Sequence, residues 1–512
     1  MNRLLICLLV VAMWACTSSS PKKTAIDFNS VPTKAGIVSG TTSSDQAVKI
    51  FMGVPFAAPP VGDLRWKAPQ PVAPWEGVRA CVTPPASALQ APPKPFMCWS
   101  KEFMAPESPL SEDCLYLNVW TAAKTAQDKL PVMVYIHGGA FTGGSGTVPL
   151  YDGEAMSRKG VVFVTINYRL GILGFMAHPE LSVESELKTS GNYGILDQIA
   201  ALKWVKENIA AFGGDPDNVT IDGQSAGAFS VNMLVVSPLA KGLFQKAIAQ
   251  SGGMFGKQLS LGSTLQAAEE TGKQLTEKLK IANIAALRAM PADSLLKIQA
   301  RFGVTVDNVV IPPVYDTFAA GKHNDVAVIS GWNADDGVSF GPGPKAEQFR
   351  ENAKKQYGDK TELFLKLFPA NTDEEAAKSQ KMVSQLFFGW NNYAWARLQA
   401  SMGTGKAYLY YFKRVPPGEP NYGAFHSAEF GYALHNLKKW DRPFTDVDFK
   451  LEDAMSSYWV NFAKTGNPNG EGLPVWPAFN ENNPEIIELG DEVKATPLPY
   501  REQMKFMDSI NN

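Results

Sequence analysis

The stretch NVTIDGQSAGAF, residues 218–229, contains the pattern that decides the fold of this chain. Residues 219–221 have the β-branched, apolar character of a buried strand, and residues 229–236 continue as an apolar helix. Between them stands GQSAG, a G-x-S-x-G pattern that puts Ser225 on a sharp turn from strand to helix. Its glycines let strand and helix approach, and the helix directs backbone N–H groups and its positive dipole end at the serine. The pentapeptide alone also fits a serine in a glycine-rich turn, so the role of Ser225 depends on the rest of the chain.

Apolar runs and helical patterns alternate on both sides of this stretch. The candidate strands are apolar nearly throughout, as buried parallel strands are; they are residues 131–136, 161–166, 219–221, 247–250, 326–330 and 407–412. Apolar residues recur at helical spacing over residues 196–212, and residues 262–302 and 346–401 are mostly helical in pattern. Strands that alternate with helices predict an α/β fold, with a mainly parallel sheet covered on both faces.

A second glycine motif follows an earlier candidate strand. The segment HGGAF, residues 137–141, comes directly after residues 131–136. An acyl-transfer enzyme needs backbone N–H donors for the negative oxygen of its tetrahedral intermediate, and a loop of this type supplies them beside G-x-S-x-G. We therefore predict an oxyanion hole formed by the backbone N–H groups of Gly138, Gly139 and Ala226.

A nucleophilic serine needs a histidine base, which in this motif order follows both the serine and the acid. Three of the five histidines follow Ser225. His426 lies in a Gly/Pro-rich loop after the candidate strand 407–412, and catalytic residues commonly stand on such loops. His435 ends a helix-like stretch near two lysines, and His323 precedes the best acid candidate. His426 is therefore the predicted base.

The acid is predicted at the end of the candidate strand 326–330. That strand runs into GWNADDG, residues 331–337, which places two adjacent aspartates at its carboxyl end. Asp336 precedes a glycine and is the predicted acid, with Asp335 as the alternative. A turn-capping role is the other interpretation of either aspartate.

The chain resembles the type-B carboxylesterases, the cholinesterase-like branch of the α/β-hydrolases, over nearly everything from residue 31 to residue 510. Besides residues 137–141 and 223–227, the resemblance is carried by residues 53–60 (GVPFAAPP), 64–66 (LRW), 111–120 (SEDCLYLNVW), 167–171 (NYRLG), 191–194 (GNYG), 196–198 (LDQ), 212–216 (FGGDP) and 459–468 (WVNFAKTGNP). It implies a central, mostly parallel, twisted sheet with helices on both faces and helical insertions over the active site. It also implies a serine carboxylic-ester hydrolase without cofactor or metal, whose partners are a small-molecule ester and water.

Carried over residue by residue, the resemblance implies Ser225 as nucleophile, His426 as base and Asp336 as acid. The family acid is most often glutamate, so the shorter Asp336 is a departure. Gln224 is another, because many members carry glutamate there, and its neutral amide favours a small to medium neutral ester over a cationic one. The expected pocket lining, whose aromatic residues also fit an ordinary core, is Phe141, Gln224, Met254, Phe255, Phe340 and Phe388.

The resemblance also implies a disulfide at Cys114, whose partner usually lies shortly upstream. Cys98 is therefore the expected partner and Cys81 the alternative, although the usual position, about residues 89–90, holds no cysteine.

The N-terminus has the pattern of an export signal. A short, weakly basic start precedes an apolar run that ends at Ala15 and is shorter than a membrane span. The next residues resemble a bacterial lipoprotein signal, so we expect a signal peptide over residues 1–15, lipid on Cys16 and a tether over residues 16–30. Ordinary signal cleavage is the alternative. Residues 31–512 then form a single hydrolase domain in the bacterial cell envelope, which reaches the membrane only through the anchor.

The composition argues against several other classes of protein. The 512 residues are 45% hydrophobic, and a net charge of -2 with a pI of about 6.3 disfavours a nucleic-acid partner. Scattered histidines and the absence of a C-x-x-C pair disfavour a metal site. Two other functions fit the same pattern: a catalytically silent adhesion protein on this fold, and an amidase or thioesterase with the same triad.

Overall fold

The computed structural model describes residues 25–256, 262–337 and 343–511. The expected signal peptide, Cys16 and Phe340 therefore lie outside the described residues.

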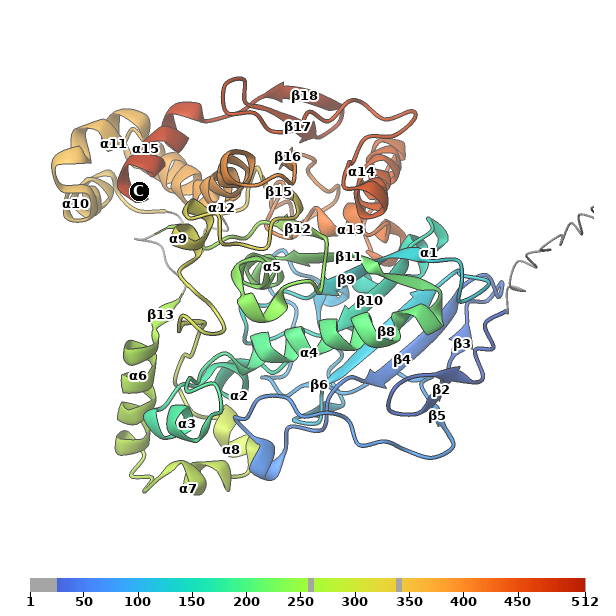
Figure 1. The fold of residues 1–512 in the computed structure, drawn as a ribbon. Helices are drawn as coiled ribbons and strands as arrows, with labels where there is room; N and C mark the ends of the chain where they lie inside the picture. The colour runs from blue at the N-terminus through green and yellow to red at the C-terminus, as the bar shows by residue number, and fades with distance from the viewer. Residues whose placement is uncertain (1–24, 257–261, 338–342, 512) are drawn as a thin grey trace, which may run out of the picture.

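The centre of the fold is an eleven-stranded sheet with the strand order β18-β17-β16-β15-β12-β11-β9-β10-β8-β4-β3 (Figure 1). Its strands are β3 (Thr41–Thr42), β4 (Lys49–Pro55), β8 (Tyr116–Thr121), β9 (Leu130–Ile136), β10 (Val162–Ile166), β11 (Gly214–Gln224), β12 (Lys246–Gln250), β15 (Ala327–Asn333), β16 (Ala407–Phe412), β17 (Glu485–Leu489) and β18 (Val493–Pro497). The strands from β17 to β10 in this order run parallel, and the strands outside them pair antiparallel. The predicted mainly parallel sheet is confirmed.

Alternate side chains of the central strands enter two separate apolar layers, because successive residues of a strand point to opposite faces. In β9, Val132 and Val134 belong to one layer, while Met133 and Tyr135 belong to the other. The first layer is covered by α4 (Tyr193–Asn208), α5 (Ala226–Val236) and α12 (Asp373–Met402). The second is covered by α1 (Glu154–Arg158), α13 (Phe430–Ala433) and α14 (Asp446–Thr465).

Two long excursions from the sheet are helical, as the pattern predicts. The region 262–302 contains α6 (Leu265–Lys278), α7 (Ile284–Arg288) and α8 (Ala292–Leu296), and the region 346–401 contains α10 (Ala346–Tyr357), α11 (Thr361–Leu367) and α12. The remaining helices are α2 (Gly171–Phe175), α3 (Pro179–Glu184), α9 (Val314–Ala319) and α15 (Arg501–Asn511). Among the described residues no helix is long and apolar enough to cross a membrane.

Residues 25–30, which are part of the predicted tether, contact the rest of the protein. The Ile26 N–H donates to the Lys124 carbonyl oxygen at 3.1 Å, and the Phe28 carbonyl oxygen accepts from the Gly40 N–H at 2.8 Å. Both apolar side chains pack against the first layer of the core. The packed part of the chain therefore begins before the expected boundary at residue 31.

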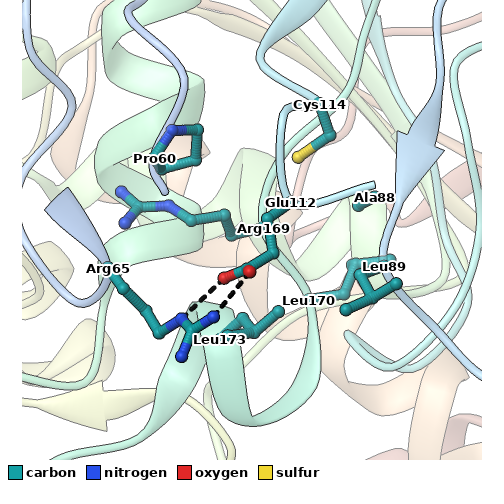
Figure 2. Close-up of a pocket in the computed structure, with 9 residues that line it drawn as sticks. All are labelled: Pro60, Arg65, Ala88, Leu89, Glu112, Cys114, Arg169, Leu170 and Leu173. Carbon is teal, nitrogen blue, oxygen red and sulfur yellow. Dashed lines mark hydrogen bonds and ion pairs between the residues drawn. The ribbon is translucent and has the colours of Figure 1, made fainter. Parts of the chain in front are cut away.

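The expected disulfide between Cys98 and Cys114 does not form, and Cys81 is also a free thiol. Cys114 belongs to the first apolar layer and Cys98 to the second, so the two thiols lie in different layers of the core. Cys114 and Leu89 both line a small cavity of about 10 Å³, and Figure 2 draws these two side chains. Gln90 follows Leu89 where a partner cysteine is usual, and its amide bonds backbone groups instead.

Candidate active site

Ser225 lies at the turn between β11 and α5. Its backbone angles, φ 56° and ψ -124°, are outside the regions that most residues occupy, so the turn is strained. A Cβ atom on Gly227 would lie 2.0 Å from the Ile136 carbonyl oxygen, and one on Gly223 would lie 2.5 Å from the Gly227 carbonyl carbon. Neither position has room for a side chain. The two glycines therefore let β11 and α5 meet closely enough to hold Ser225 at the carboxyl end of a central strand.

His426 and Asp336 are in direct contact. His426 Nδ1 lies 2.6 Å from Asp336 Oδ1. Asp336 Oδ2 accepts from Ser251 Oγ at 2.7 Å and from the backbone N–H of Asn333 at 2.9 Å. Since these two donors hold one oxygen, the other is fixed toward the histidine. A neutral His426 then donates Nδ1–H to Asp336 and leaves Nε2 as an acceptor.

Asp335 is held on other partners. Its carboxylate accepts the backbone N–H of Ala424 at 2.7 Å and forms an ion pair with Lys381. The structure therefore places Asp336, and not its neighbour Asp335, against His426.

Gln224 contacts the other ring nitrogen of His426. Gln224 Nε2 lies 3.3 Å from His426 Nε2. Because Nε2 is the acceptor in the tautomer that Asp336 favours, the amide of Gln224 is the donor. The nitrogen that would accept a proton from Ser225 is thus bonded to the residue directly before Ser225.

The predicted oxyanion residues come together around Ser225. A Cβ atom on Gly138 would lie 3.1 Å from Ser225 Cβ, so this loop lies against the serine. Gly139 has φ 111°, and its carbonyl oxygen accepts the N–H of Gly143 at 3.0 Å, which closes a tight turn. Within the described chain the N–H groups of Gly138 and Gly139 have no acceptor. Ala226 is the first residue of α5, and an N–H at that position has no acceptor inside its helix.

Ser225, His426 and Gly138 line a cleft of about 720 Å³. This volume is in the range of pockets that bind drug-sized ligands. Its large apolar lining residues are Phe96, Trp99, Phe103, Met104, Tyr151 and Phe430. Sequence patterns do not single them out, because they come from the irregular loop around Phe96 and Trp99 and from three short helical turns, at residues 101–103, 149–151 and 430–433, that meet only in the fold.

The predicted pocket residues are distributed differently. Gln224 lines the cleft, and the Phe388 ring centroid lies 4.7 Å from that of His426. Phe141 and Phe255 are buried in the first apolar layer, and Met254 is partly buried against it. The sequence positions of these three residues therefore match packing in the core.

The carboxylesterase family model matches residues 27–507. The chain belongs to this family. Fumonisin B1 esterase of Sphingopyxis macrogoltabida is 38% identical over 492 residues, which are 90% of this chain and 86% of that protein. Para-nitrobenzyl esterase of Bacillus subtilis (strain 168) is 36% identical over 499 residues, 92% of this chain and 97% of that protein. A solved PNB esterase structure matches with a TM-score of 0.81 at 33% identity, over 94% of this chain and 99% of that chain. The protein is a carboxylesterase of type B with the α/β-hydrolase fold.

The esterase has a further carboxyl group behind Asp336 that the sequence analysis did not identify. Glu429 is fully buried and accepts the side-chain N–H of Asn333, whose backbone N–H donates to Asp336. Burial, together with the nearby charge of Asp336, raises the pKa of Glu429 to about 7. Asp222, three residues before Ser225, is also fully buried, and burial holds its pKa well above the usual range. Two titratable carboxyls thus lie beneath the site.

Other histidines of the esterase have structural contacts. His435 Nδ1 lies 3.1 Å from Ser456 Oγ, and the His323 ring stacks on Phe318 with 4.1 Å between centroids. Burial lowers the pKa of His137 to about 4, so its ring is neutral where it supports the glycine loop. None of these three is among the residues that line the cleft.

Proposed function

We propose that the esterase hydrolyses its substrates through an acyl-enzyme, with Ser225 as nucleophile, His426 as base and Asp336 as acid. The observation that carries this proposal is the 2.6 Å contact between His426 Nδ1 and Asp336 Oδ1, beside a serine on a strained strand-to-helix turn. A base oriented by a carboxylate and a nucleophile exposed at a strand end are the parts that serine acyl transfer requires.

In the first half of the reaction, Ser225 Oγ attacks the ester carbonyl while His426 Nε2 takes its proton. Asp336 holds the imidazole orientation through Nδ1–H and stabilises the imidazolium. Backbone N–H groups of Gly138, Gly139 and Ala226 stabilise the negative oxygen of the tetrahedral intermediate. His426 then returns the proton to the leaving alcohol. Water attacks the acyl-enzyme in the second half, by the same proton path, and releases the acid.

The step requires Ser225 Oγ to replace Gln224 as the partner of His426 Nε2. The Gln224 amide is 3.3 Å away, a long and therefore weak hydrogen bond. Because Gln224 is neutral, it supplies no negative charge to attract a cationic alcohol group. We propose a small to medium ester that is neutral at its reacting end.

We also propose that the esterase is exported to the cell envelope and anchored through lipid on Cys16. The apolar run that ends at Ala15, followed by Cys16 and a polar stretch, supports this proposal. Metabolic labelling with a radioactive fatty acid should label the wild type and not Cys16→Ser. Equal labelling of the two proteins would contradict lipidation at this residue.

Activity measurements on active-site variants test the catalytic proposal. Ser225→Ala and His426→Ala should each lower kcat for p-nitrophenyl butyrate at least about 10³-fold. His435→Ala, a histidine outside the cleft, should retain wild-type kcat. Full activity of folded Ser225→Ala would contradict the proposal.

Matched substrates separate the related reaction classes. An ester, a thioester and an amide of the same acid should be hydrolysed with the ester preferred over the amide. A preference for the amide would assign the same triad to an amidase. No turnover of any of the three by folded wild type would favour a binding protein.

A further inference from the structure

The loop of residues 89–100 forms one wall of the cleft and is fixed near both ends. Near its start, Gln90 donates Nε2–H to the Gly144 carbonyl oxygen at 2.8 Å and accepts the Gly144 N–H at the same distance. Near its end, Trp99 donates Nε1–H to Ser427 Oγ at 3.2 Å, and Ser427 directly follows His426. The wall is therefore tied to the oxyanion loop at one end and to the histidine loop at the other.

Prolines stiffen the middle of this loop around Lys94. Pro92, Pro93 and Pro95 each have φ restricted to about -65°. Because Lys94 precedes a proline, its own backbone is restricted to extended conformations. The following turn is closed by two hydrogen bonds of 3.0 Å between the backbones of Phe96 and Trp99. The backbone therefore fixes the place from which the Lys94 side chain leaves the wall.

Lys94 gives the cleft its charge. Of the cleft-lining residues that the structure describes, it is the one Lys, Arg, Asp or Glu. Its ammonium group makes no ion pair or hydrogen bond with any residue in the part of the chain that the structure describes. The lysine nearest to Lys94 in sequence is Lys101. Its Nζ lies 3.9 Å from Glu102 Oε1, and it is not among the residues that line the cleft. Among the described residues, Lys94 is thus an exposed cation without an ion-pair partner, and the other described residues of the cleft lining are neutral or apolar apart from His426.

We propose that Lys94 selects esters that carry a free carboxylate, on the part of the substrate that lies along the loop of residues 89–100. This inference rests on the proposed function and narrows it. The reacting end of the substrate stays neutral beside Gln224, and the acid group lies toward Lys94 at another part of the same cleft.

A carboxylate fits this wall better than a phosphate. One lysine supplies a single point charge, whereas phosphate sites generally combine several cationic or backbone donors. The aromatic rings of Phe96 and Trp99, whose centroids lie 4.7 Å apart, line the same cleft as Lys94 and offer apolar surface to the chain or ring that carries the acid. The wall therefore combines one cation with apolar contact area.

Two pairs of matched esters test the proposal. On the acyl side, p-nitrophenyl hydrogen suberate is compared with p-nitrophenyl suberamate; on the alcohol side, 4-acetoxybenzoate is compared with 4-acetoxybenzamide. For the preferred pair, the ratio of kcat/KM of the acid to the amide should fall about fivefold in Lys94→Gln and further in Lys94→Glu. Lys94→Arg should retain the wild-type ratio. The wild-type ratio should also decrease as salt rises from about 20 mM to about 500 mM, because salt screens exposed charges.

Lys101→Gln is the matched control, since it removes a neighbouring lysine that does not line the cleft. It should leave the ratio unchanged. An equal ratio in wild type and Lys94→Gln for both pairs would overturn the proposal, as would an equal fall in Lys101→Gln. Cleavage of the ester bond in the carboxamide-bearing esters is measured separately. If wild type cleaves neither the acid-bearing nor the carboxamide-bearing esters, the proposed function fails and this inference fails with it.

Discussion

Replacement of Glu429 by glutamine should make the esterase more stable at alkaline pH, with a much smaller gain in acid. Glu429 is fully buried, and its one described partner is the side-chain N–H of Asn333. Glutamine can accept the same hydrogen bond and carries no charge. The substitution therefore removes the cost of ionising a buried carboxyl beside Asp336 while it keeps the contact.

The magnitude follows from the pKa of Glu429, which burial raises from 4.5 to about 7. A carboxyl whose pKa is raised in the folded state favours folding at low pH, and this contribution is lost as pH rises from the unfolded value through the folded one. With these two values, the loss is about 1 kcal/mol at pH 5 and about 3 kcal/mol at pH 8. The gain in Glu429→Gln should therefore be about 2 kcal/mol larger at pH 8 than at pH 5.

Urea denaturation of wild type and Glu429→Gln at the two pH values measures this difference. The control is Glu347→Gln, a substitution at an exposed glutamate of α10. It should change the free energy of unfolding by less than about 0.5 kcal/mol at either pH. A gain in Glu429→Gln that is equal at pH 5 and pH 8 would refute the reasoning, because the effect would then come from packing and not from ionisation.

Three further predictions concern the predicted acid, the residue before Ser225, and the two cysteines. Asp336→Asn should lower kcat about 10⁴-fold, while Asp335→Asn, which loses only contacts outside the cleft, should lower it less than about fivefold; the reverse order would make Asp335 the acid. Gln224→Glu should raise kcat/KM for a choline ester relative to its neutral isostere, because it adds negative charge beside His426; an unchanged ratio would show that Gln224 does not select substrates. Alkylation of the unreduced, unfolded protein, read by mass spectrometry, should find Cys98 and Cys114 as free thiols, and a peptide that links them would contradict the structure.

The sequence predicted the elements whose signals are local. The six candidate strands all exist, and the glycines around Ser225 stand where strand and helix leave no room for a side chain. Motif order and positions after strands predict His426 and Asp336 as a pair, and the two side chains lie in contact. These features follow from short-range steric rules and from the order of strands, both of which a single chain displays.

Features that depend on which layers meet in space could not be predicted. Cys98 and Cys114 are near in sequence but enter different apolar layers. Phe255 has the spacing of a pocket residue and belongs to the core. No sequence pattern marks Glu429 or Lys94. The importance of Glu429 comes from its burial near Asp336, and that of Lys94 from its place with Trp99 in the lining of the cleft.

Covalent labelling of Ser225 tests the central claim most directly. The folded esterase is treated with a fluorophosphonate, digested and mapped by mass spectrometry, with Ser225→Ala and Ser251→Ala treated in parallel. The account predicts one stoichiometric adduct on Ser225 in wild type, loss of the adduct in Ser225→Ala, and labelling retained in Ser251→Ala. An unlabelled wild-type protein, or an adduct on a serine other than Ser225, would contradict it.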